Sequence, residues 1–146
     1  MPTDMRLLLL TIGFGDRKKP EETLYEPLKK TVNDGNFTRV ILLPSKVTDD
    51  TAKLLQEMWA DIPIEIKSLP EPGNEDDADA CFAHYNNVIE EILSTGVERE
   101  SIVIDFTRGT KAMSAGLVLA AVRHDIHELR YITGPRTDQG HVIPGY

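Results

Sequence analysis

The sequence predicts an α/β protein, built as a three-layer sandwich in which helices cover both faces of a mainly parallel central sheet. Short apolar runs rich in leucine, isoleucine and valine alternate along the chain with longer segments of helical periodicity. Parallel strands that are buried on both faces read as such runs, and a crossover helix joins each to the next. The length of 146 residues suits one core, so we expect a single domain over residues 1–146.

The first elements alternate strand, helix and strand. The apolar run Met5–Ile12 predicts a buried strand that ends in a glycine-containing loop. Residues 20–34 carry apolar side chains at helical spacing and begin with a proline and two acids, which is typical of a helix start. Pro27 falls inside this pattern and is expected to kink or delay the helix. The run Thr38–Pro44 predicts a second buried strand.

The middle of the chain continues the alternation. Residues 48–61 predict an amphipathic helix with Thr48 or Asp49 as the N-cap. The segment Ile62–Leu69 alternates apolar and polar side chains, which indicates a shorter third strand near an edge of the sheet. A loop rich in proline, glycine and acids follows, and Ala78–Leu93 predicts the next helix.

The last elements contain the most distinctive stretch of the sequence. Ser101–Phe106 predicts a fourth strand, residues 110–125 a helix, and His127–Thr133 a fifth strand. A turn at Gln139–Gly140 then indicates a short C-terminal β extension. The whole order predicts a Rossmann-like sandwich, in which ligands bind beyond the carboxyl ends of the strands.

Three loops are predicted at those carboxyl ends, and they share residue types that reach phosphates. They combine glycine-exposed amides, hydroxyls and cations, and they span Gly13–Asp16, Phe106–Thr110 and Gly134–Arg136. Phe14, in the first loop, can stack on a base or plug into the core. Arg136, in the third, can grip a phosphate, whereas Gly134 with Pro135 can equally form a simple turn.

The second loop, “DFTRGTK”, is the strongest candidate for an anion site. Gly109 can adopt positive φ, and Thr110 can cap the following helix so that free amides point outward toward an anion. Arg108 and Lys111 add positive charge, and the hydroxyls of Thr107 and Ser114 lie nearby in sequence. The alternative is a plain helix cap with incidental cations. Asp105 has two open roles, direct ligand contact or holding the loop by accepting backbone N–H groups.

Composition and spacing exclude several other functions. The net charge of −8 disfavours a protein that coats DNA or RNA. The Walker and dinucleotide glycine spacings are absent, and no hydrolytic triad stands out. The “NEDDAD” run is interpreted as solvated charge. No metal site is expected, because the four histidines lack the spacing of metal ligands: His84, His124, His127 and His141. No cofactor is expected either. A lone cysteine, Cys81, suits a reducing cytoplasm, and no apolar run is long enough to span a membrane.

These motifs resemble the CARF domain (CRISPR-associated Rossmann fold) over nearly the whole chain. The most specific part is a D-x-T-x-G-T-K-x-M-S block, matched at Asp105, Thr107, Gly109, Thr110, Lys111, Met113 and Ser114. The closing G-x-R…G-x-V-x-x-G segment is matched at Gly134, Arg136, Gly140, Val142 and Gly145. The first loop is variable in the family and carries less weight.

The resemblance implies a cytoplasmic sensor of cyclic oligoadenylate, the second messenger of type III CRISPR antiviral defence. It implies a homodimer that holds this ring-shaped RNA across its two-fold axis, with tetra-adenylate favoured and hexa-adenylate next. The helix after Thr110 then packs against its mate or, alternatively, only against the sheet. CARF domains usually precede an effector, which is absent from these residues, so the chain is a free-standing protein or the sensor domain of a longer one. No DNA binding is expected of this domain.

The same resemblance implies roles for individual residues. Amides of Gly109, Thr110 and Lys111 would bind phosphate or ribose, and Lys111 and Arg108 would supply charge. Thr107, Met113 and Ser114 would shape the wall and Arg136 would close over the ligand. The first loop would contact adenine through Phe14, Gly15 and Asp16.

Two other functions stay open at this point. Some CARF domains are ring nucleases that cut the cyclic ligand to linear products without metal, and Lys111 would then stabilise the transition state. The remaining alternative is a Rossmann-like module for another nucleotide or for protein docking, because a fold alone does not determine function.

Overall fold

The computed structural model describes residues 5–13, 19, 21–59 and 61–132. Its centre is a five-stranded parallel sheet in the order β3-β2-β1-β4-β5. The strands are β1 (Leu7–Thr11), β2 (Arg39–Leu43), β3 (Ile64–Ile66), β4 (Ile102–Asp105) and β5 (Glu128–Arg130). The predicted Rossmann-like α/β fold is confirmed. The predicted C-terminal β extension lies outside the described residues.

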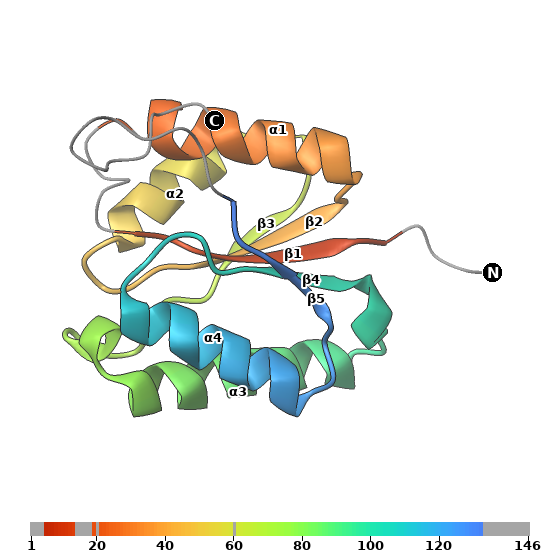
Figure 1. Cartoon of the computed structure of the whole chain (residues 1–146). Coiled ribbons are helices and arrows are strands. Elements are labelled where there is room, and N and C mark those ends of the chain that lie inside the picture. Colours follow the sequence, from red (N-terminus) through yellow and green to blue (C-terminus); the bar gives the residue numbers. More distant parts are fainter. Residues whose placement is uncertain (1–4, 14–18, 20, 60, 133–146) are drawn as a thin grey trace.

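Among the described residues, four α-helices cover both faces of the sheet, as Figure 1 shows. They are α1 (Glu26–Gly35), α2 (Asp49–Met58), α3 (Ala78–Ser94) and α4 (Lys111–Arg123). In Figure 1, α1 and α2 lie above the sheet and α3 and α4 below it. Each face has its own apolar core, one shared with α1 and α2 and the other with α3 and α4. In the described part of the chain, no helix combines the length and the apolar character needed to cross a membrane.

The central strand β1 supplies both cores because successive side chains point to opposite faces. Leu7 and Leu9 pack with α3 and α4, whereas Leu8 and Leu10 pack in the α1 and α2 core. All four leucines are at most 1% exposed. A strand buried on both faces has no polar side to show, which explains the unbroken leucine run.

The helical segment with the internal proline begins where the sequence pattern suggested, but its first turn is not α-helical. A π-helical turn at Glu21–Tyr25 precedes α1, and Pro27 lies in the first turn of α1. The first turn of a helix has N–H groups without intrahelical partners, so the missing N–H of proline costs little there. The disturbance expected at Pro27 thus takes the form of a change from π-helical to α-helical structure directly before it.

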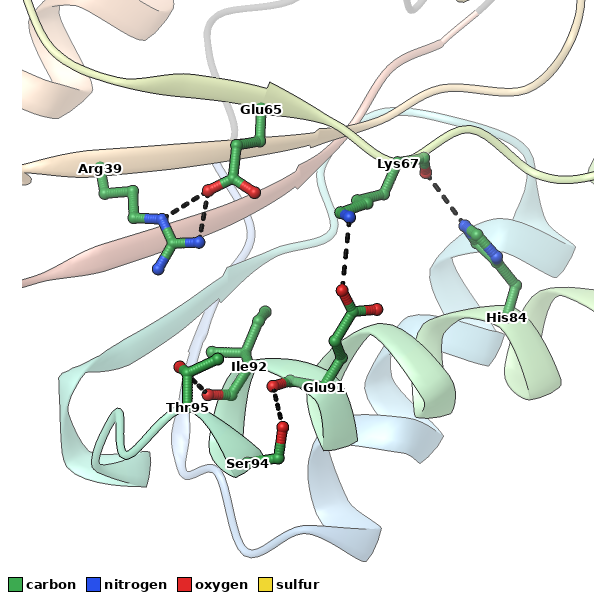
Figure 2. Close-up of polar contacts among 8 residues, drawn as sticks. All are labelled: Arg39, Glu65, Lys67, His84, Glu91, Ile92, Ser94 and Thr95. Atoms are coloured by element: carbon green, nitrogen blue, oxygen red, sulfur yellow. Dashed lines mark hydrogen bonds and ion pairs between the residues drawn. The ribbon is translucent and has the colours of Figure 1, made fainter.

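The edge position predicted for the third strand is also confirmed, and Figure 2 shows the polar side of that edge. Arg39 Nε donates to Glu65 Oε1 at 2.7 Å, and Lys67 Nζ lies 3.6 Å from Glu91 Oε1 on α3. The imidazole of His84 contacts the Lys67 carbonyl at 3.0 Å. The alternating pattern therefore reflects a strand with one buried side and one side exposed to water and to charged neighbours.

Helices α3 and α4 approach each other closely at Gly116. A Cβ atom placed on Gly116 would lie 2.7 Å from the Cβ of Cys81 and 2.8 Å from the amide nitrogen of Phe82. These neighbours include backbone, so they cannot move aside cheaply. Glycine at this position therefore sets the spacing of the two helices.

We expect Gly116→Ala to lower the free energy of unfolding by about 1–3 kcal/mol, because the added methyl group overpacks the helix contact. Urea unfolding followed by circular dichroism measures the change. The exposed substitution Arg123→Ala on the same helix is the control and should stay within about 0.5 kcal/mol of wild type. A more stable G116A protein, as helix propensity alone would give, would contradict the close contact.

Candidate functional site at the carboxyl ends of β1 and β4

The winding of the sheet reverses between β1 and β4. The chain adds β2 and β3 on one side of β1, then crosses over to place β4 and β5 on the other. Leu10 pairs with Asp105, so the two strands end at the same edge and the loops that follow them leave side by side. Such a reversal opens a crevice between neighbouring loops, where ligands of open α/β sheets bind. Of the first loop, Gly13 is described and buried, whereas Phe14, Gly15 and Asp16 lie outside the described residues.

The loop after β4 is held from its inner side by three side chains. Asp105 is 1% exposed and its Oδ1 accepts the Thr107 N–H at 2.9 Å. The hydroxyl of Thr11, at the end of β1, donates to the Arg108 carbonyl. The hydroxyl of Ser114 donates to the Phe106 carbonyl at 3.0 Å. Asp105 thus makes the loop-holding contact that the sequence left open as its second role.

Two threonine hydroxyls of the loop also have partners within the protein. Thr110 caps α4 by accepting the Met113 N–H at 3.1 Å, and its hydroxyl donates to the Glu75 carbonyl. Thr107 Oγ1 accepts the Ile132 N–H at 2.7 Å. The hydroxyls of Thr107 and Ser114 were expected in the ligand-binding wall, whereas the Thr110 hydroxyl was expected to cap the helix, as it does. In this structure they organise the loop itself.

The backbone at the start of α4 carries N–H groups that are available to a ligand. Within the described part of the chain, the amides of Gly109, Thr110 and Lys111 donate no hydrogen bond. Gly109 has φ +98°, and the side chain of Lys111 is exposed. Free amides, the positive end of the helix dipole and a lysine together form an environment that favours an anion. Chemically, the site can hold phosphate oxygens.

Met113 lies beneath this backbone and is not exposed. It is 1% exposed, and a Cβ atom on Gly109 would approach its Cε at 3.2 Å. The side chain therefore supports the turn from the core side. Gly134 and Arg136, predicted for the third loop, lie outside the described residues.

The acidic loop after β3 reaches this site, which sequence reasoning missed. The 3₁₀ turn η3 (Asn74–Asp76) lies against the start of α4 through the Thr110–Glu75 contact. Asp77 caps α3, because its Oδ1 accepts the Ala80 N–H at 3.1 Å. The interpretation of this run as merely solvated charge is therefore incomplete. An aspartate directly before a helical pattern is an N-cap signal that was available in the sequence.

An aromatic pair beside the loop is a second missed feature. The rings of Phe106 and Tyr131 stack with centroids 5.5 Å apart and 29° between their planes. Tyr131 is 55% exposed, so part of this pair is open to solvent. Exposed aromatic faces are surfaces on which bases stack. Tyr131 therefore joins the candidate residues, whereas Phe14 cannot be placed.

Cys81 lies near this region but is chemically quiet. Its thiol donates to the Asn74 carbonyl at 3.1 Å and is buried between the helices. Burial, with a smaller contribution from Asp77, raises the pKa of the Cys81 thiol to about 11. The thiol is therefore protonated at neutral pH and is no nucleophile. No group of three or more metal-ligating side chains occurs among the residues the structure describes.

No protein-family model matches the chain, and no curated protein sequence does so. Solved structures do match its fold. A type III CRISPR defence DNA nuclease activated by cyclic oligoadenylate superposes with TM-score 0.61 and 18% identity, covering 93% of this chain and 20% of that one. Csm6 of Enterococcus italicus, bound to cyclic hexa-2′-fluoro-hexa-dAMP, gives TM-score 0.57 and 22% identity, covering 94% and 35%. Can2 of Sulfobacillus thermosulfidooxidans, in complex with cyclic tetra-adenylate, gives TM-score 0.57 and 17% identity, covering 87% and 32%.

These likenesses establish a shared fold. The chain spans between 20% and 35% of the length of these three proteins. The expected fold is therefore confirmed by both the sheet topology and its neighbours.

We expect Thr110→Ala to destabilise the protein by about 1 kcal/mol, because α4 loses its N-cap and the tie to Glu75. Thermal unfolding measures the change, with Thr110→Ser as the matched control that keeps the hydroxyl. Equal stability of T110A and wild type would contradict the structural role assigned to this threonine.

Proposed function

We propose that this domain binds cyclic oligoadenylate and serves as the sensor unit of a type III CRISPR ancillary protein in antiviral defence. The observation that carries the proposal is a set of amides at the start of α4, at the reversal point of the sheet, that have no acceptor among the described residues. Its fold is shared with proteins whose structures hold cyclic adenylates. Phosphate groups of the ring would meet the amides of Gly109, Thr110 and Lys111.

The charge of the chain makes the local cations important. A protein of net charge −8 repels polyanions over most of its surface, so a phosphate ligand needs a focused positive site. Lys111 is exposed at the helix start, and Arg108 is half-buried in the same loop. The stacked pair of Phe106 and Tyr131 would offer an adenine ring an aromatic face. Tetra-adenylate is the ring proposed first and hexa-adenylate the second.

The outer side of α4 supports a second proposal, a homodimer. Its inner side packs on α3 and the sheet through Met113, Gly116, Leu117, Ala120 and Ala121. The outer side carries Ala115, Val118, Leu119 and Val122 at helical spacing, with Leu119 57% and Val122 59% exposed. A helix that is apolar all round is normally covered all round. A second copy of this chain would cover the stripe and bring two anion sites to one axis, which suits a ring of even symmetry.

Cleavage of the ring is the competing outcome. In this reaction a ribose 2′-oxygen would bond to the adjacent phosphorus and the P–O5′ bond would break, leaving a 2′,3′-cyclic phosphate and a 5′-hydroxyl. The hydroxyl proton would pass through water to the departing 5′-oxygen. Lys111 is exposed at the start of α4, where a cation can stabilise the charge that develops on the phosphate oxygens. Binding and cleavage use the same site, so one experiment separates them. A longer protein containing this domain would use the binding event to control its remaining parts.

We expect the purified protein to bind cyclic tetra-adenylate in EDTA, and Lys111→Ala to weaken binding by about 10-fold or more, because a charged contact to phosphate is lost. Calorimetry measures affinity and chromatography follows the ring. Lys30→Ala, an exposed lysine on α1, is the control for net charge. The measurement is repeated with cyclic hexa-adenylate. An intact ring indicates a sensor and linear products indicate a ring nuclease. A protein that binds neither ring rejects the proposal.

We expect Leu119→Glu to convert the dimer to a monomer, because a carboxylate in an apolar interface must be desolvated. Analytical ultracentrifugation reports the mass of wild type and variant. Leu54→Glu places the same charge on an exposed leucine of α2 and should leave the dimer intact. A monomeric wild-type protein, or a dimeric L119E protein, would show that the outer side of α4 is no dimer interface.

A further inference from the structure

The hydroxyl of Thr11 is an unusual feature of the central strand. Thr11 ends β1 after four leucines and is 0% exposed. Its hydroxyl donates to the carbonyl of Arg108, which lies 97 positions away in the sequence. Buried strand positions of this kind suit valine or isoleucine, which bring no polar group that needs a partner. The polar group at Thr11 has one described partner, and that partner belongs to the candidate anion loop.

This contact fixes the orientation of one peptide unit. The described part of the chain contains no cis peptide bond, so the unit joining Arg108 and Gly109 is trans. In a trans peptide the carbonyl and the N–H point in opposite directions. The Arg108 carbonyl points toward the buried Thr11 side chain, so the Gly109 N–H points away from it. Gly109 can follow with φ +98° because it lacks a side chain.

The opposite orientation of this peptide unit would reverse the sign of the partial charge that it presents at the outer side of the loop. If this peptide unit turned over, the Arg108 carbonyl would replace the Gly109 N–H on the outer side of the loop. An oxygen with partial negative charge would then face an anion in place of a donor. Asp105 holds the Thr107 amide one step earlier in the loop. The hydroxyl of Thr11 acts on the Arg108–Gly109 unit itself, through the Arg108 carbonyl.

We propose that Thr11 is a positioning residue of the anion-binding loop. Its hydroxyl selects the peptide orientation in which the Gly109 N–H faces the phosphate. The inference rests on the proposed function, because it assigns Thr11 a part in binding by the same site. Thr11 itself does not touch the ligand, since its side chain is buried beneath the loop.

The test compares Thr11→Val, which keeps the shape and removes the hydroxyl, with Thr11→Ser, which keeps the hydroxyl. Affinity for cyclic tetra-adenylate is measured by calorimetry, each protein at the same interval below its own Tm. We expect T11V to bind about 10-fold more weakly, since one phosphate donor is lost, and T11S to stay within about threefold of wild type. Thr51→Val, at a buried threonine of α2, controls for loss of stability and should leave affinity unchanged.

A second readout follows the peptide unit directly. In ¹⁵N-labelled protein without ligand, the exchange rate of the Gly109 amide and its sequential NOE to the Arg108 Hα report the orientation of this unit. We expect both to change in T11V and to return in T11S. A purely packing role for Thr11 would move Tm without this pattern of loss and rescue.

The outcomes are distinct for the two proposals. If wild type binds the ring and T11V binds equally well, the positioning role is overturned and the proposed function stands. If wild type binds neither ring, the proposed function fails, and the Gly109 measurements decide the role of Thr11 alone. Unchanged exchange and NOE in T11V would overturn it in that case.

Discussion

The pairing of β1 with β4 is the contact on which the rest of the structure depends. Both strands are buried on both faces, and Leu7 to Leu10 pair in register with Ile102 to Asp105. Burial of apolar surface stabilises a fold by roughly 25 cal/mol per Å², and this effect holds the two distant segments together. The pairing joins the two apolar cores and brings the loops after both strands to one edge. Without it, Thr11 and Arg108 would have no reason to meet.

The site at that edge divides its polar groups between two tasks. Side-chain oxygens of Asp105, Thr107, Thr110 and Ser114 satisfy backbone groups of the loop and its neighbours. Buried polar groups need hydrogen-bond partners, so the loop keeps its shape because these side-chain oxygens bond to its backbone groups. The backbone amides at the start of α4 are then left over as donors. Recognition of an anion would thus come from the main chain, while the side chains supply its rigidity.

Much of this arrangement follows from local sequence, and some of it cannot. The strands, the edge position of β3 and the disturbance at Pro27 depend on burial and on backbone chemistry within a few residues, which sequence patterns report. The start of α4 at Thr110 was likewise readable from its capping chemistry. The partners of the hydroxyls were not, because Thr11 meets Arg108 and Thr110 meets Glu75 only through the tertiary fold. Ring size, dimerisation and ligand roles stay predictions, since neither fold nor sequence pattern measures binding.

The contact between Thr107 and Ile132 joins the loop before α4 to the segment that follows β5. The Ile132 amide is held by the Thr107 hydroxyl, and Tyr131 stacks on Phe106, so the chain leaves β5 attached to the same turn that precedes α4. These two contacts are a physical route by which a displacement of one segment would reach the other. Thermodynamic linkage is reciprocal: if a restraint on the chain at Ile132 changed the affinity of the loop for a ligand, ligand binding would change the equilibrium of that restraint by the same factor. The position of the chain after β5 and ligand binding at the loop before α4 would then be coupled through one equilibrium.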